Sequence, residues 1–233
     1  LLTKRDIIII IITELINKMI ISKRKESVFM KPKNCIVVFG GAFNPPLNSH
    51  FFMAQEVLNE FEEVEKVIFV PVNKNYHKKG LFSNEHRYNM LKLITDKNDG
   101  FLVSDIDLKG ERPLYTIEVL NKMQEQYKDK EICFLLGTDN LKQLDTWKDA
   151  EELLSRFKFL VMNRDNDNIE EIVKSSELLR CYKENIIEII PEIRDNYSST
   201  FVRSQIKKGK SPRYLMPDEV LEYIEKNKLY RGN

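Results

Sequence analysis

The sequence predicts a doubly wound α/β fold, with a mostly parallel, Rossmann-like sheet and a C-terminal helical tail. Three observations carry this prediction. Continuous apolar runs of strand length recur along the chain, helix-period segments separate them, and the first run leads into paired glycines. Uninterrupted apolar runs are typical of strands that are covered on both faces, and strands that alternate with helices favour parallel pairing.

The predicted elements follow in order from residue 35. Strands are expected where the apolar runs lie, at residues 35–39, 67–70, 132–136, 157–161 and 186–190. Helices are expected at residues 85–94 and from Thr116 to Tyr127, where apolar side chains recur three or four positions apart. Pro217 predicts the start of the last helix, because proline is favoured at the first helical position. No linker interrupts the pattern, so residues 31–233 are predicted to form one domain.

Residues 1–30 are predicted to be an N-terminal extension of unknown role. The apolar stretch within it, residues 7–21, is shorter than the roughly 20 residues that a membrane span needs, and polar side chains interrupt it. We therefore expect no membrane span. A contact of this segment with a membrane surface or a partner stays open, and so does a homo-oligomer.

Charge and cysteine content narrow the class of protein. The 233 residues carry 37 Lys and Arg against 36 Asp and Glu, a formal net charge of +1. This balance argues against a dedicated nucleic-acid-binding protein and favours small-molecule partners. The three cysteines show no metal-binding spacing, so we expect structural thiols in a reducing, cytoplasmic compartment.

The loop after the first strand, Gly40–His50, is predicted to bind an anion. Its two glycines let a ligand approach the backbone. Asn48 or Ser49 is expected to cap a helix that carries His50 in its first turn. Backbone amides and the positive end of that helix would then face a phosphate, with the imidazole as a further donor. The loop matches neither the dinucleotide fingerprint nor the Walker P-loop.

Two later loops also place polar side chains at strand ends. Asp139 is expected to take a ribose hydroxyl and Trp147 to stack on a flat heterocycle; the alternatives are a capping aspartate and a core tryptophan. Further on, the hydroxyls of residues 197–200 are expected to cap a helix, with Arg203 pointing back at a bound anion. The alternative there is an ordinary cap with a solvated arginine.

Together these segments resemble the nicotinate or nicotinamide mononucleotide adenylyltransferases of the nucleotidylyltransferase superfamily, over nearly all of residues 35–230. The first loop is similar to the motif G-G-x-F-D/N-P-x-H-x-G-H, and residues 197–203 to I-S-S-T-x-x-R. Residues 70–87 and 213–230 resemble further segments of the family. Leu47 and Ser49 replace the first histidine and the glycine of H-x-G-H, whereas the eukaryotic-type pattern F-N-P-x-x-N-x-H is matched.

The resemblance implies a direct attack of the mononucleotide phosphate on the α-phosphorus of ATP, with release of pyrophosphate. The catalytic residues would be His50, Lys78 and Arg203. ATP would be bound by Gly40, Gly41, Ala42, Phe43, His50, Gly137, Asp139, Ser199, Thr200 and Arg203. The mononucleotide would be bound by Asn44, Tyr115, Thr116 and Trp147. Mg²⁺ would accompany ATP as a mostly water-ligated ion without a dedicated protein cage.

Two other functions stay open at this point. A sibling transferase that uses phosphopantetheine or a cytidine nucleotide would share the first loop. A non-catalytic nucleotide sensor on the same fold would be explained by Leu47 in place of the motif histidine. The sequence does not distinguish the acid from the amide form of the mononucleotide, because the predicted contacts to that group come from main-chain atoms.

Overall fold

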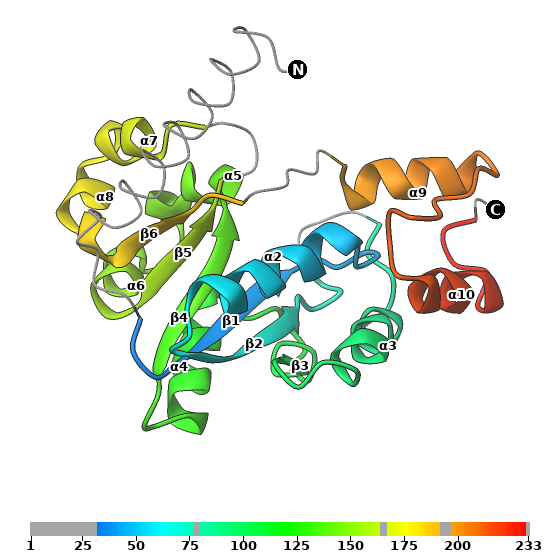
Figure 1. Ribbon diagram of the computed structural model, residues 1–233, viewed down its shortest axis with the longest axis horizontal. Coiled ribbons are helices and arrows are strands. Elements are labelled where there is room, and N and C mark those ends of the chain that lie inside the picture. Colours follow the sequence, from blue (N-terminus) through cyan, green and yellow to red (C-terminus); the bar gives the residue numbers. More distant parts are fainter. Residues whose placement is uncertain (1–31, 77–79, 164–166, 192–196, 232–233) are drawn as a thin grey trace, which may run out of the picture. The chain divides into compact units, whose positions relative to one another are not determined.

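The computed structural model describes residues 32–76, 80–163, 167–191 and 197–231, so the predicted extension at residues 1–30 lies outside the described residues. Six parallel strands form one sheet in the order β3-β2-β1-β4-β5-β6 (Figure 1). The strands are β1 (Cys35–Gly41), β2 (Val64–Pro71), β3 (Phe101–Val103), β4 (Glu131–Gly137), β5 (Lys158–Met162) and β6 (Ile186–Ile189). This topology confirms the predicted doubly wound, Rossmann-like fold.

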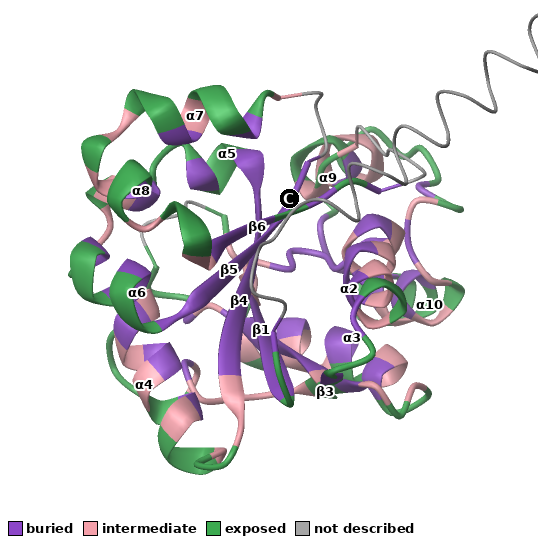
Figure 2. Cartoon of the chain, turned by 60° about the vertical axis from the view of Figure 1, so that its left-hand side comes forward, coloured by how far each residue is buried: buried purple, intermediate pink, exposed green. Residues whose placement is uncertain are grey.

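The central strands are buried on both faces, which explains their uninterrupted apolar sequences. Residues 35–38 of β1 are completely buried. Ile36 and Val38 belong to one core cluster and Cys35 and Val37 to the other, so alternate side chains of the strand serve opposite faces. In Figure 2 the middle of the sheet is accordingly drawn as buried.

Helices cover the two faces in the doubly wound manner. Helices α2 (Asn48–Glu60) and α3 (Asn84–Thr95) precede β3 in the chain. They cover the face of Cys35 and Val37, to whose core cluster they contribute Phe51, Ala54, Val57 and Leu91. The helices between β3 and β6 are α4 (Thr116–Gln126), α5 (Thr138–Leu141), η1 (Leu144–Thr146), α6 (Ala150–Arg156), α7 (Ile169–Ser175), α8 (Glu177–Cys181) and η2 (Lys183–Asn185). Apolar side chains of α4 to α8 belong to the opposite cluster.

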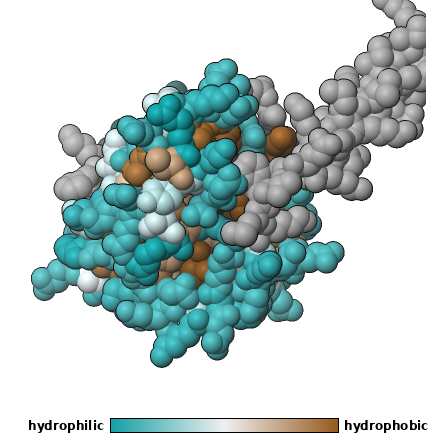
Figure 3. All heavy atoms as spheres, turned by 90° about the vertical axis from the view of Figure 1, so that its left-hand side faces the viewer, coloured by the Kyte–Doolittle hydropathy of each residue, from teal (hydrophilic) through white to brown (hydrophobic). Residues whose placement is uncertain are grey.

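The outer side of this helix layer is polar. Figure 3 views the molecule from the side of α7 and α8, and hydrophilic side chains dominate that face, with small separate apolar patches. This is expected of helices whose apolar sides face a sheet. Within the described part of the chain, no helix is both long and apolar enough to cross a membrane.

The C-terminal tail consists of α9 (Ser199–Lys207), α10 (Asp218–Lys226) and the residues up to 231. Pro217 occupies the cap position of α10, one residue before the first helical position at which the sequence placed it. The tail has a core of its own, formed by Val202, Met216, Val220, Leu221, Ile224, Leu229 and Tyr230. Leu47 and Met90 complete this tail cluster, so the tail packs on the loop after β1 and on α3.

Candidate functional site

The loop between β1 and α2, residues 42–47, lies at the carboxyl edge of the sheet, where ligands of doubly wound folds bind. Phe43 adopts a φ of 44° in it, in the left-handed region that few residues other than glycine occupy. Phe43, Asn44 and Leu47 are each at most 2% exposed. The loop is therefore part of the core rather than a surface excursion.

The paired glycines make room for aromatic rings beneath this loop. A Cβ at Gly40 would lie 3.0 Å from the ring of Phe134, and one at Gly41 would lie 2.9 Å from the ring of Phe43. The same Phe134 ring contacts Trp147 edge-on, with ring centroids 6.0 Å apart. Phe134 thus links the first loop to the predicted heterocycle-stacking residue.

Arg87, in α3, holds the start of this loop by hydrogen bonding. Its side chain is fully buried and donates to three oxygens, those of Phe82 (3.0 Å), Ala42 (3.1 Å) and the Asn84 side chain (2.9 Å). Burial lowers the pKa of Arg87. Ala42 was expected to help bind ATP through its backbone, and its carbonyl is bound within the protein by Arg87. Sequence reasoning gave Arg87 no such role, because nothing in its spacing shows that it is buried.

His50 is the third residue of α2, and its ring is oriented by the backbone. The N–H of Leu47 donates to His50 Nδ1 at 2.9 Å, which leaves the proton of the neutral imidazole on Nε2. The prediction that Asn48 or Ser49 caps this helix was wrong: Leu47 occupies the cap position, and the His50 ring reaches back to its N–H. The Asn48 amide instead donates to the carbonyl of Tyr214 (2.9 Å).

Leu47 replaces the first histidine of the H-x-G-H motif, and in this structure it is a core residue. It is 1% exposed and packs in the tail cluster. No phosphate donor comes from this side chain. His50, in the first turn of α2, is partly accessible.

Helix α9 brings Arg203 and Ser199 to the same loop. Arg203 donates from Nη1 to the carbonyl of Asn44 (2.8 Å) and from Nη2 to Thr200 Oγ1 (3.1 Å). Ser199 Oγ donates to the carbonyl of Pro45 (2.9 Å). Ser198 caps the helix by accepting from the N–H of Phe201, so the predicted cap is present. The solvated-arginine alternative is wrong, because the guanidinium is held on the loop.

Asn44 was expected to contact the mononucleotide, and its side chain is instead engaged within the protein. Its amide donates to the carbonyl of Gly80 (2.9 Å), and its Oδ1 accepts from the N–H of Phe82 (3.3 Å) and the hydroxyl of Tyr230 (2.9 Å). Asn44 is 2% exposed. The structure thus makes Asn44 an anchor of the loop, and its contact with a substrate stays a prediction. Lys78, the third predicted catalytic residue, lies outside the described residues.

The predicted ribose ligand Asp139 lies in the first turn of α5, after β4. Gly137 occupies the cap position, so Asp139 is not the cap of this helix. A Cβ at Gly137 would lie 2.6 Å from Asp139 Oδ1, which shows that the carboxylate folds back over the end of the strand. Asp139 is exposed. An exposed carboxylate at a strand end is well placed to accept from ribose hydroxyls.

Trp147 and Tyr115 lie at the surface of the same half of the molecule. Trp147 packs against the core edge but is only partly buried, which fits neither a pure core residue nor a fully solvated one. Tyr115 is 55% exposed and caps α4, which Thr116 begins. Both main-chain groups of Tyr115 have partners: its N–H donates to Glu118 Oε2 (2.8 Å), and its carbonyl accepts from the N–H of Val119 (3.0 Å).

Asp107 is a buried acid that sequence reasoning missed. It accepts from the N–H groups of Leu114 (2.7 Å) and Asn73 (3.0 Å), and so it joins the loops that follow β2 and β3. Burial raises the pKa of Asp107, and the two backbone donors partly oppose that effect. Its role is to hold the loop that leads to Tyr115.

Comparisons with known proteins agree on one family. Residues 38–205 match the cytidylyltransferase-like family model. A protein of Caldicellulosiruptor saccharolyticus described as a probable nicotinate-nucleotide adenylyltransferase is 36% identical over 84% of this chain and 98% of its own length. A protein of the same description from Desulfitobacterium hafniense is 34% identical over 86% and 97%.

Solved structures show the same fold. A Plasmodium falciparum nicotinic acid mononucleotide adenylyltransferase complexed with NaAD matches with a TM-score of 0.71. The match covers 84% of this chain and 96% of that chain at 19% sequence identity. At that identity the comparison establishes the fold alone.

Proposed function

The chain belongs to the cytidylyltransferase-like family, among the nicotinate-nucleotide adenylyltransferases, and we propose from this premise that it transfers the adenylyl group of ATP to nicotinate mononucleotide. The products would be deamido-NAD and pyrophosphate, which places the protein in NAD biosynthesis. One observation carries the proposal: the loop at residues 42–47 is bound at the same time by His50 of α2 and by Arg203 of α9.

The reaction we propose is an in-line displacement. A phosphate oxygen of the mononucleotide forms a bond to the α-phosphorus of ATP, and the bond from that phosphorus to the β-phosphate oxygen breaks. Such transfers depend on positioning and on stabilisation of phosphate charge. His50 would donate from Nε2, and Arg203 would donate with the N–H groups that do not bind Asn44 and Thr200.

The other predicted residues take supporting roles in this proposal. Asp139 would accept from a ribose, and Trp147 would present its accessible face to the pyridine ring. The donors that approach the ring substituent would come from Thr116 and its surroundings, since both main-chain groups of Tyr115 are engaged. Ser199 would act indirectly, by holding the carbonyl of Pro45.

Mg²⁺ would reach the site together with ATP. Within the described ranges, no three His, Cys, Asp or Glu side chains come together as ligands. Phosphate oxygens and water would therefore supply most of the ligands, as is usual for this ion. When bound, the ion would neutralise triphosphate charge.

We favour the acid form of the mononucleotide over the amide. The curated relatives are described by the nicotinate substrate, and two structural neighbours are complexed with NaAD and with APC. The cytoplasmic location and the absence of a nucleic-acid partner stay predictions, and a homo-oligomer stays open.

A pyrophosphate-release assay with ATP and each mononucleotide tests the proposal. We expect turnover with nicotinate mononucleotide and a lower kcat/KM with nicotinamide mononucleotide. Phosphopantetheine and a cytidine nucleotide pair serve as controls for a sibling transferase. ATP binding without pyrophosphate release from any pair would overturn the enzyme assignment in favour of a nucleotide sensor.

A further inference from the structure

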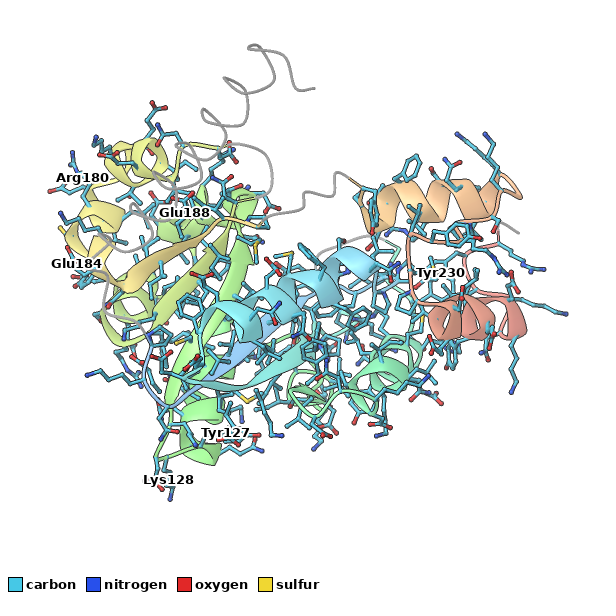
Figure 4. The ribbon with its side chains drawn as sticks, viewed as in Figure 1. Tyr127, Lys128, Arg180, Glu184, Glu188 and Tyr230 are labelled. Carbon is cyan, nitrogen blue, oxygen red and sulfur yellow. The ribbon has the colours of Figure 1, made fainter. Side chains whose placement is uncertain are left out.

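Tyr230, near the end of the described chain, reaches the loop after β1 from the tail. Its side chain is 6% exposed, and its hydroxyl donates to Asn44 Oδ1 at 2.9 Å, across 186 positions of sequence. Its ring packs on that of Phe82, with centroids 4.3 Å apart. In Figure 4 Tyr230 lies on the side of the tail that faces the sheet domain.

Two parts of the tail contact Asn44, namely α9 and the residues that follow α10. Its carbonyl accepts from Arg203 Nη1 at 2.8 Å, while its Oδ1 accepts from the Tyr230 hydroxyl. The other donor to Oδ1, the N–H of Phe82, is at the longer distance of 3.3 Å. Tyr230 therefore supplies the shorter of the two bonds to Asn44 Oδ1, and Asn44 in turn supports the guanidinium proposed to stabilise phosphate charge.

The tail holds Tyr230 in an unusual backbone conformation. Lys228 and Tyr230 have φ values of 53° and 60°, both in the left-handed region, which costs about 1 kcal/mol or more for such residues. The N–H of Leu229 donates to the carbonyl of Ile224, and Leu229 is buried in the tail cluster. Conformations of this kind persist where surrounding contacts enforce them, and here they turn a tyrosine inward.

We propose that Tyr230 is a positioning residue for adenylyl transfer, which fixes Asn44 through its hydroxyl and so sets the place of the Arg203 guanidinium. This inference rests on the proposed function. Burial raises the pKa of the Tyr230 hydroxyl well above its ordinary value, against the opposing charges of Arg203 and Arg87, so the hydroxyl stays a donor. No contact of Tyr230 with a substrate is needed for this role.

The test compares Tyr230→Phe with Tyr223→Phe. Tyr223 lies on α10, and its hydroxyl contacts His86 Nδ1 (3.0 Å) and Asn89 Nδ2 (3.3 Å) rather than the loop. Each variant loses one buried or partly buried tail hydroxyl and keeps the ring. We expect kcat to fall about 10-fold in Tyr230→Phe, because small displacements of positioned groups are costly in rate. The KM values of Tyr230→Phe, and both kcat and KM of Tyr223→Phe, should stay within about 2-fold of wild type.

Repeating the Tyr230→Phe substitution in an Arg203→Ala enzyme separates a specific effect on Arg203 from a nonspecific loss of structure in the tail. If Tyr230 acts through Arg203, then Tyr230→Phe should cause no further loss of kcat in an Arg203→Ala enzyme, because groups that act as a unit are non-additive. Equal kcat in the two tyrosine variants, or the same 10-fold loss in the Arg203→Ala background, would overturn the inference.

Hydrogen exchange gives a readout that does not depend on turnover. The amides of Leu47 and Phe82 donate within the anchored region, to His50 Nδ1 and Asn44 Oδ1. Both amides should exchange faster in Tyr230→Phe than in wild type, and their exchange rates should be unchanged in Tyr223→Phe. A wild-type protein without pyrophosphate release refutes the proposed function, whereas unchanged exchange in Tyr230→Phe refutes the anchoring itself.

Discussion

His50 and Arg203 approach the loop after β1 from two different helices, and the backbone of that loop orients both side chains. His50 accepts from the N–H of Leu47 on one side of its ring, and Arg203 donates to the carbonyl of Asn44 with one of its nitrogens. The bonds to Asn44 and Thr200 use only part of the hydrogen-bonding capacity of Arg203, so its guanidinium keeps further N–H groups. Pre-oriented donors stabilise developing charge without reorganisation during the reaction.

The first prediction concerns these two donors. His50→Ala and Arg203→Ala should each lower kcat by about 100-fold or more, while the protein stays folded. Pyrophosphate release measures kcat, and ATP binding by calorimetry is the control. A variant that keeps nearly the wild-type kcat with intact ATP affinity would show that its residue only holds the loop.

Trp147 carries the second prediction, because its ring is shared between packing and an accessible face. Trp147→Ala should weaken mononucleotide binding by about 1 to 3 kcal/mol and leave ATP affinity nearly unchanged, on the scale of stacking between a base and an aromatic ring. Trp147→Phe keeps an aromatic face and should lose less.

Fluorescence checks the same point directly, because the chain has one tryptophan. Saturating mononucleotide should change the emission, whereas ATP alone should change it little. If neither mononucleotide has an effect and Trp147→Ala mainly lowers Tm, the indole serves the contact with Phe134 and the core edge.

Among the elements, α4 shows how a surface ion pair shapes a predicted substrate loop. Arg112 binds Glu118 through both of its terminal nitrogens, at 2.8 and 2.6 Å, and Glu118 also accepts from the N–H of Tyr115. The hydrogen bond from Arg112 and that from Tyr115 lower the pKa of Glu118 to about 2. This carboxylate fixes the start of the helix, next to Thr116.

The third prediction follows from that pKa. An acid whose pKa is lower in the folded state stabilises the protein above its unfolded pKa, and the stabilisation is lost as the pH falls toward the folded pKa. Glu118→Gln should therefore be less stable than wild type at pH 7, by at most about 1 kcal/mol for so exposed a pair.

Chemical denaturation across pH tests this prediction. The stability difference between wild type and Glu118→Gln should shrink between pH 4.5 and about 2, the interval between the ordinary and the lowered pKa. Glu125→Gln, a substitution on the same helix away from Arg112 and Tyr115, is the matched control. A difference that is constant across pH would contradict the assignment.

The elements also show what the sequence could and could not predict. The long buried strands were found because burial on both faces leaves an uninterrupted apolar run. Strand β3 was missed because its apolar run, Phe101–Val103, has only three residues, which is shorter than the runs that mark the other strands. The sequence located the loops of the site, but the anchoring roles of Arg87, Asn44 and Tyr230 depend on contacts between distant segments that local patterns do not contain.

For the whole molecule, the fourth prediction concerns the N-terminal extension. Every candidate site residue lies between residues 40 and 203, and the sheet begins at Cys35. Deletion of residues 1–29 should therefore leave kcat and Tm nearly unchanged. Thermal unfolding and the pyrophosphate assay on the shortened chain measure both. A large fall in Tm would mean that residues 7–21 contribute to the stability of the domain or of an assembly.

Because residues late in the chain anchor this short loop, its anchoring is complete only when nearly the whole chain has been synthesised. All six strands of the sheet are complete by Ile189, but two of the bonds to Asn44 come from Arg203 and Tyr230, 159 and 186 positions downstream. Contacts of such separation form slowly, because closing a long loop costs conformational entropy. A nascent or prematurely terminated chain that ends directly after α10 would carry the complete sheet, yet it would lack Tyr230 and its bond to Asn44.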